Sequence, residues 1–197
     1  AAPVWAVVAL EMREGVDAAA FALAMYDGMM EAAREYGFAV VGGNVVGGVT
    51  RLGVAVTMGG EVDAGQAWRR AGARAGDGVF VTGAFGGAAL GLRALRVGYV
   101  GGDGAALVGW AARYRRPVAR LRETRALRAA GCVTSCIDVS DGLLQDLGHV
   151  ARASGVGFEI HADAIPVAPG YGEGAARFGD GYWDAALWGG DDYELAF

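Results

Sequence analysis

The sequence predicts an α/β fold for residues 1–60 and an α+β fold for the remainder, with mixed sheets covered by helices on one face. An apolar run, Val4–Leu10, is followed by a helical pattern that begins at Asp17. A glycine pair, Gly59-Gly60, then interrupts the chain and marks the best candidate boundary. Further along, a strand pattern passes directly into a helix pattern around Asp138.

The first unit is predicted to contain a strand, a long helix and two further strands. Val4–Leu10 is the first strand, and the helix that Asp17 opens has its apolar residues on one face. That face consists of Phe21, Met25, Met29 and Ala32. Residues that favour β-structure predict the other two strands at Phe38–Val41 and Leu52–Met58.

The second unit mixes short strands with helices. β-branched and aromatic residues predict strands at Val79–Thr82 and Val156–Ile160, and helical spacing predicts a helix over Ala88–Leu95. Residues 164–184 contain two prolines and many glycines, so we expect a long irregular loop there. Loops of that length are usually functional or mobile in compact domains.

A run of arginines lies within residues 113–128, which are predicted to be helical on both sides of Pro117. A solvated helix face explains this run better than a nucleic-acid patch, because only Tyr114 could offer an aromatic platform. The formal net charge of −5 also argues against a general nucleic-acid binder.

Length and composition indicate a globular protein. With 197 residues and 54% hydrophobic content, the chain can form one large domain or two small ones. No apolar run reaches the roughly 20 residues of a membrane helix, and no basic segment precedes the first apolar run as in a signal peptide. We therefore expect a cytoplasmic location. Cys132 and Cys136 are too few for a disulfide framework and are expected to be buried thiols.

The run from Ser135 to Leu147 is the most informative segment, because it places two carboxylates and a hydroxyl between a strand and a helix. Ser140 or Asp141 is the expected N-cap. The free N–H groups and the dipole at such a helix start attract phosphate, and Asp138 and Asp141 lie close enough to share a hard cation. A capped helix with a solvated acid is the alternative that this run alone leaves open.

Three other segments add to this turn: Gly42-Gly43-Asn44, Arg70–Asp77 and Gly189–Leu195. Together with Asp138–Leu143 they resemble the motifs G-G-D, R-S-G-A-R-P-G-D, G-G-E-D-Y-E-L and D-x-S-D-G-L of the thiamine-monophosphate kinase family, whose superfamily includes aminoimidazole ribonucleotide (AIR) synthetase. Their order and spacing fit over nearly the whole chain. The glycine-framed acidic motif at the end separates this kinase from its superfamily relatives.

The resemblance implies a PurM-like two-domain architecture. Residues 1–60 would be the C-terminal part of an ATP-binding and dimerisation domain, and residues 61–197 an AIR synthase-related C-terminal domain that is incomplete at its end. The implied activity is ATP-dependent phosphorylation of thiamine monophosphate to thiamine diphosphate with Mg²⁺, in a homodimer.

The resemblance also implies roles for individual residues. Asp138 and Asp141 would bind magnesium, Asn44 replaces a magnesium-binding aspartate, and Asp191 replaces a glutamate that touches the thiamine substrate. The implied ATP-binding residues are Tyr26, Gly43, Asn44, Arg70 and Ser140. No catalytic side chain is expected, because phosphoryl transfer depends mostly on positioning and charge neutralisation.

Departures from the family motifs carry expectations of their own. Asn44 brings an oxygen but no charge, so a cation there should be held more weakly. The opening Ala1-Ala2-Pro3 aligns just after the family's first aspartate motifs, and Phe197 aligns before its C-terminal substrate-contacting region. We therefore expect the chain to be truncated at both ends. The absent N-terminal part would supply further magnesium ligands and much of the dimer-forming sheet.

Two alternatives remain. Another ATP-using enzyme of the superfamily, such as AIR or selenophosphate synthetase, is disfavoured by Asp191–Leu195. A non-catalytic nucleotide-binding or dimerisation module is the alternative from a different class. Aspartate motifs upstream of Ala1 would favour the kinase, and a natural start at Ala1 would favour the module.

Overall fold

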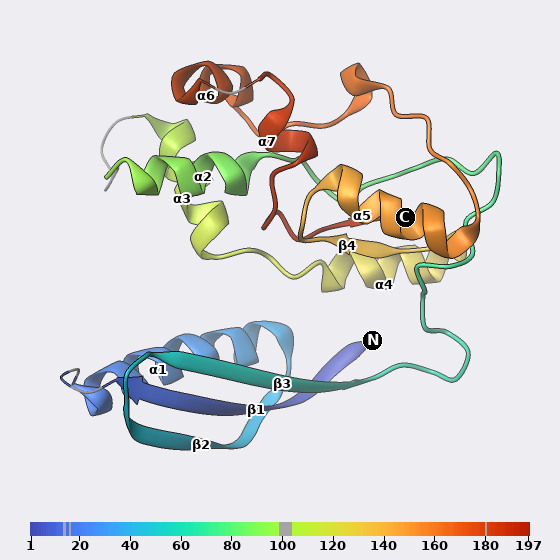
Figure 1. Cartoon of the computed structure of the whole chain (residues 1–197). Helices are drawn as coiled ribbons and strands as arrows, with labels where there is room; N and C mark the ends of the chain where they lie inside the picture. The colour runs from blue at the N-terminus through green and yellow to red at the C-terminus, as the bar shows by residue number, and fades with distance from the viewer. Residues whose placement is uncertain (14, 16, 99–103, 180) are drawn as a thin grey trace. The chain divides into compact units, whose positions relative to one another are not determined.

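The computed structural model describes residues 1–13, 15, 17–98, 104–179 and 181–197 (Figure 1). The chain forms two compact units, Ala1–Ala67 and Trp68–Phe197, so the change of unit lies a few residues beyond the glycine pair. The elements of the two units are β1 (Ala2–Arg13), α1 (Ala18–Tyr36), β2 (Ala39–Val49), β3 (Gly53–Glu61), α2 (Gly87–Arg96), α3 (Ala105–Arg115), α4 (Leu121–Ala130), β4 (Ile137–Val139), α5 (Leu143–Ser154), a 3-10 turn (Ala162–Ala164), α6 (Tyr171–Phe178), α7 (Asp184–Leu187) and β5 (Glu194–Ala196). None of the helices described is both long and apolar enough to cross a membrane.

The first unit is a mixed sheet with one helix packed on it. Strand β1 is central, parallel to β2 and antiparallel to β3, and α1 connects the two parallel strands. The helix begins where it was predicted to begin, since Asp17 is the N-cap of α1 and its Oδ1 accepts the N–H of Ala20 at 3.0 Å. The three predicted strands are all present and are longer than their apolar runs.

Alternation along β1 positions the core of the first unit. Val8, Leu10 and Met12 are buried, and they pack against α1 side chains that include Met25 and Met29. Because successive side chains of a strand point to opposite faces, the residues between them point away from α1.

The second unit is mostly helical and contains the two-stranded antiparallel sheet β4–β5 (Figure 1). Its core includes Phe85, Leu90 and Tyr171, which are among the most deeply buried large side chains. The indole N–H of Trp110 donates to the carbonyl oxygen of Pro169 at 2.9 Å, which ties α3 to the segment before α6. The predicted α2 and the arginine-bearing helices α3 and α4 are confirmed.

Two predicted strands of the second unit are not among its named strands. Val79–Thr82 nevertheless pairs with the end of the chain: Phe80 exchanges two backbone hydrogen bonds with Phe197, Val81 forms an antiparallel bridge with Ala196, and the N–H of Thr82 donates to the carbonyl oxygen of Leu195. Val156–Ile160 belongs to no strand and lines a cavity. Val156–Ile160 favours β-structure, but none of the described strands pairs with it. The strand β5 is only 3 residues long.

The predicted loop over residues 164–184 was also wrong in part, because it contains α6. Gly170 precedes this helix in a left-handed conformation, with φ of 72°. Tyr171 and Ala175, one turn apart, are its buried face together with Gly174. The many glycines of the segment obscured this short apolar face.

Candidate functional site

The two acidic motifs of the second unit lie side by side. Val139 of β4 pairs with Glu194 of β5. Beyond that pair, the N–H of Tyr193 donates to the carbonyl oxygen of Val139, and the N–H of Asp191 donates to that of Ser140, each at 2.9 Å. Backbone hydrogen bonds therefore join two segments that are far apart in the sequence.

Glycine is required where these segments meet. A Cβ on Gly190 would lie 2.5 Å from the carbonyl oxygen of Ser140, and one on Gly189 would lie 2.1 Å from that of Ala185. Both distances are shorter than any real Cβ contact allows, so the glycine pair permits the close approach.

Three of the predicted site residues, Asp138, Asp141 and Asp191, act electrostatically on Tyr193. The phenol of Tyr193 donates to Asp191 Oδ1 at 3.3 Å. Burial raises the pKa of Tyr193, and the charges of the three aspartates raise it further. Asp191 and Tyr193 both have left-handed backbone, with φ of 67° and 51°. Such strain in residues other than glycine is concentrated at functional sites.

The start of α5 differs from the prediction. Its N-cap is Gly142, with φ of 118° and no side-chain cap, rather than Ser140 or Asp141. Asp146, in the first turn of α5, reaches back, and its Oδ2 accepts the N–H groups of both Ser140 and Asp141 at 3.0 Å. These two donors are therefore not free for phosphate. An acid in the first helical turn was the available signal for this contact.

Asp138 and Asp141 are exposed carboxylates with few protein partners. Asp138 is exposed and its side chain makes no hydrogen bond or ion pair with any described residue, and the side chain of Asp141 accepts only the Gln145 side-chain N–H, at 3.2 Å. No three acidic, histidine or cysteine side chains among the described residues converge into a closed metal centre. Magnesium keeps several waters and commonly uses one or two carboxylates plus substrate phosphates, so this donor set fits it.

The segment that begins at Arg70 is tied by its backbone to the same unit. The carbonyl oxygen of Arg69 accepts the N–H of Cys136 at 2.9 Å, and that of Arg70 accepts the hydroxyl of Ser154 at 3.2 Å. The exposed Arg70 is therefore held beside the strand that carries Asp138 and the end of α5.

The remaining predicted residues belong to the first unit. Tyr26 is exposed on α1, whereas Gly43 and Asn44 lie on β2, in register with Val8 and Ala9 of β1. Since Val8 packs against α1, Asn44 shares with Ala9 the opposite face of the sheet. The structure thus brings Gly43 and Asn44 together and places Tyr26 on the other layer of this unit.

Two of the arginines expected on a solvated face serve a buried acid instead. Glu194, in the last acidic motif, is fully buried. It binds the guanidinium groups of Arg113 and Arg120 and accepts the hydroxyl of Thr82 at 2.7 Å. A buried carboxylate requires such compensation, so these arginines anchor the motif that positions Asp191.

Asp192 anchors the same motif from another side. The residue is only 2% exposed. Its carboxylate accepts the N–H groups of Gly86 at 2.7 Å and Ala88 at 3.1 Å, at the start of α2. Burial raises the pKa of Asp192, although these two hydrogen bonds and Arg113 favour its charged form. Asp192 is thus buried, and it lies between Asp191 and Tyr193, whose backbones are in the left-handed conformation.

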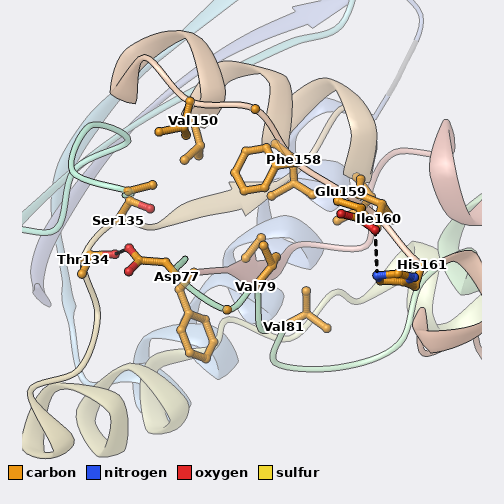
Figure 2. Close-up of a pocket in the computed structure, with 18 of the residues that line it drawn as sticks. Asp77, Val79, Val81, Thr134, Ser135, Val150, Phe158, Glu159, Ile160 and His161 are labelled. Atoms are coloured by element: carbon orange, nitrogen blue, oxygen red, sulfur yellow. Dashed lines mark hydrogen bonds and ion pairs between the residues drawn. The ribbon is translucent and has the colours of Figure 1, made fainter. Parts of the chain in front are cut away.

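A cavity of about 660 Å³ is a separate feature of the second unit (Figure 2). Phe158 and other apolar side chains line much of it, together with the hydrogen-bonded pair Thr134–Asp77, at 2.8 Å, and the pair His161–Glu159, at 3.3 Å. No predicted site residue lines this cavity.

The cysteines only partly match their prediction. Cys132 is exposed rather than buried, whereas Cys136, next to β4, is half-buried. Burial raises the pKa of the Cys136 thiol to about 11, and the nearby charge of Asp138 contributes to this shift.

Curated relatives support the resemblance expected from the motifs. The chain is 35% identical over 200 residues to the thiamine-monophosphate kinase of Salmonella typhimurium, covering 99% of this chain and 58% of the relative. It is 31% identical to that of Aquifex aeolicus, covering 99% of this chain and 61% of the relative. The chain thus spans about three fifths of the length of these proteins.

Solved structures match in fold as well. The structure described as AaThiL complexed with AMPPCP and TMP has a TM-score of 0.88 at 31% identity, over 99% of this chain and 61% of that one. A thiamine-monophosphate kinase from Stenotrophomonas maltophilia K279a has a TM-score of 0.89 at 36% identity, over 100% of this chain and 61% of that one. These matches confirm the predicted PurM-like fold class.

The family model for the C-terminal domain of AIR synthase-related proteins matches residues 74–175, which is just over half of the chain. The match spans α2 to α5 and includes the turn that carries Asp138 and Asp141. The chain therefore belongs to the AIR synthase-related protein family.

Proposed function

We propose that this chain is the larger part of an ATP-dependent thiamine-monophosphate kinase, which phosphorylates thiamine monophosphate to thiamine diphosphate with Mg²⁺. The observation that carries the proposal is the backbone pairing of the two acidic motifs, which places Asp138, Asp141 and Asp191 around Tyr193. The relatives' names, and the complex of AaThiL with AMPPCP and TMP, support the same activity.

In this proposal each motif has a distinct task. Asp138 and Asp141 hold magnesium, which when bound neutralises charge on the ATP phosphates. Ser140 and Arg70 contact ATP. Asp191, on the paired segment, contacts the thiamine substrate. Acceptor and donor phosphates can then be bound at one shared edge, formed by the two hydrogen-bonded segments.

The reaction needs positioning more than a reactive side chain. A phosphate oxygen of thiamine monophosphate forms a bond to the γ-phosphorus of ATP, and the bond from that phosphorus to the β,γ-bridging oxygen breaks, releasing ADP. Such transfer is accelerated by alignment of the two phosphates and by opposite charge nearby. The buried pairs of Glu194 with Arg113 and Arg120 keep the substrate-side segment fixed during this step.

Residues of the first unit have assigned roles as well. Gly43, Asn44 and Tyr26 are assigned to ATP, with Asn44 also a neutral ligand to a cation. A homodimer is part of the proposal, and exposed apolar side chains on the sheet support it. They include Val41, Val45, Val54, Val56 and Met58. We also propose a cytoplasmic location, where ATP is available.

The test is formation of thiamine diphosphate from ATP and thiamine monophosphate by the longest natural form of the chain. Calorimetry should show ATP binding with Mg²⁺ and much weaker binding without it, because the triphosphate would otherwise face Asp138 and Asp141 unneutralised. The variant Asp138→Asn should weaken the magnesium-dependent binding. Asp163→Asn, an exposed acid outside the motifs in the sequence, is the matched control.

Other outcomes identify the alternatives. Binding of ATP without any transfer to thiamine monophosphate would favour the nucleotide-binding module. Turnover of another phosphate acceptor in its place would favour a different ATP-using member of the superfamily. Equal affinity for ATP with and without Mg²⁺ would contradict the metal assignment of Asp138 and Asp141.

A further inference from the structure

Asp146 is the buried acid closest in the chain to the proposed cation ligands. It lies in the first turn of α5 and is 3% exposed. Its Oδ2 accepts the N–H groups of Ser140 and Asp141, both at 3.0 Å. A single carboxylate oxygen therefore fixes two consecutive peptide groups of the turn.

The backbone of Ser140 is hydrogen-bonded on both sides, to α5 and to the segment that carries Asp191. Its N–H donates to Asp146, and its carbonyl oxygen accepts the N–H of Asp191 at 2.9 Å. The direction of the Asp141 side chain follows from this peptide, because Asp141 itself is exposed and accepts only Gln145. Rotation of the turn would require loss of hydrogen bonds to a buried charge, which are among the stronger ones.

The same contact changes which ligands the turn before α5 accepts. The N–H groups of Ser140 and Asp141 precede the N-cap Gly142, and Asp146 occupies both of them. A bare phosphate at this turn would find neither donor free and would approach a buried carboxylate. A cation-bound phosphate would meet no such repulsion, because Asp138 and Asp141 would hold the cation and its charge would offset that of the carboxylates.

We propose that Asp146 is a positioning residue, which orients the Ser140–Asp141 turn for Mg²⁺ and makes it select magnesium-bound over free nucleotide. This inference rests on the proposed function, since it assigns a task within the same site. Residues that orient metal ligands from behind affect metal affinity by roughly 10- to 100-fold when they are changed.

Two variants separate the geometry of Asp146 from its charge. Asp146→Ala removes the acceptor and leaves two N–H groups unpaired. Asp146→Asn keeps one oxygen, which can still accept both N–H groups, and removes the charge. Asp184→Ala is the matched control, because Asp184, in the first turn of α7, also accepts the N–H of a residue before its helix, that of Gly181 at 2.9 Å.

The measurements are amide hydrogen exchange at Ser140 and Asp141, and calorimetric binding of Mg²⁺, ATP and Mg·ATP to the longest natural form of the chain. Asp146→Ala should speed exchange at both amides and weaken Mg²⁺ binding by about tenfold or more. Asp146→Asn should restore slow exchange and most of the Mg²⁺ affinity. It should also bind free ATP several-fold more tightly than the wild type does.

The outcomes are distinguishable. Wild-type exchange and wild-type Mg²⁺ and ATP affinities in both Asp146 variants would overturn the inference and leave the proposed function intact. A wild-type protein that binds neither Mg²⁺ nor Mg·ATP would overturn the proposed function and this inference together. If Asp146→Ala does not fold, Asp146→Asn still tests the proposal through the ratio of its affinity for free ATP to its affinity for Mg·ATP. A ratio equal to that of the wild type contradicts the proposal.

Discussion

The carbonyl oxygen of Ser140 accepts the N–H of Asp191 at 2.9 Å, and this bond joins the proposed metal-binding turn to the proposed substrate-binding segment. Gly190 makes the approach possible, because any side chain there would meet the same carbonyl. The distance between the two proposed binding segments is therefore set by backbone contacts, and it should respond to a change as small as one methyl group.

Gly190→Ala tests that contact. The new Cβ would lie 2.5 Å from the Ser140 oxygen, so the segments must separate. We expect a loss of about 1–3 kcal/mol in the free energy of unfolding, as for other overpacked sites, with weaker Mg·ATP binding. Urea denaturation and calorimetry measure the two effects. Gly157→Ala is the control, since nothing lies within 4 Å of its Cβ. Equal stability of the two variants would contradict the close approach.

Asp141→Asn separates metal binding from structure. Gly142, not Asp141, is the N-cap of α5, and the Asp141 carboxylate is exposed. The free energy of unfolding should therefore change by no more than about 0.5 kcal/mol. Thiamine diphosphate formation should collapse, because the developing charge on the transferred phosphoryl group loses its counter-ion. Melting temperature and product formation are measured on the same preparation. Retained activity would make Asp141 a solvated acid.

Local sequence patterns predicted much of the fold. The apolar run of β1, the start of α1 at Asp17 and the apolar stripe of α1 are properties of neighbouring residues, and all are present. The strand and helix that flank Asp138–Asp141 follow from the same kind of pattern. The family motifs added the grouping of Asp138, Asp141 and Asp191, which spacing alone does not reveal.

Contacts between distant residues could not be predicted in this way. The strand expected at Val156–Ile160 has no partner among the described strands. Arg113 and Arg120 carry no local sign that they bind Glu194, which is remote in the sequence and buried only in the fold. Asp146 was missed because its backward contact replaced the usual N-cap that the composition of the turn suggested.

Cys136 should report cation binding at Asp138. Its thiol pKa is about 11, mainly through burial and also through the charge of Asp138. Near pH 9 only ~1% should be thiolate, so iodoacetamide should modify the exposed Cys132 much faster. Mg²⁺ at Asp138 should lower the pKa of Cys136 and speed its alkylation, as should Asp138→Asn. Peptide mapping by mass spectrometry measures both rates. A magnesium effect that persists in Asp138→Asn would show that the cation binds elsewhere.

The stability of the wild type relative to Asp192→Asn should depend on pH. The wild type should compare more favourably with the variant in acid than at neutral pH. Burial raises its pKa in the folded state above the ordinary value of 3.8, so the folded state binds this proton more tightly than the unfolded state does. The resulting stabilisation is complete below pH 3.8 and is lost as the pH rises through the folded-state pKa. Asn cannot titrate, and it keeps one acceptor for the N–H groups of Gly86 and Ala88.

Urea denaturation of both proteins from about pH 4 to neutral pH gives the difference in unfolding free energy. That difference should shift steadily against the wild type as the pH rises. A difference that stays constant, or that shifts in favour of the wild type, would mean that the hydrogen bonds from α2 and the charge of Arg113 outweigh the cost of burying Asp192.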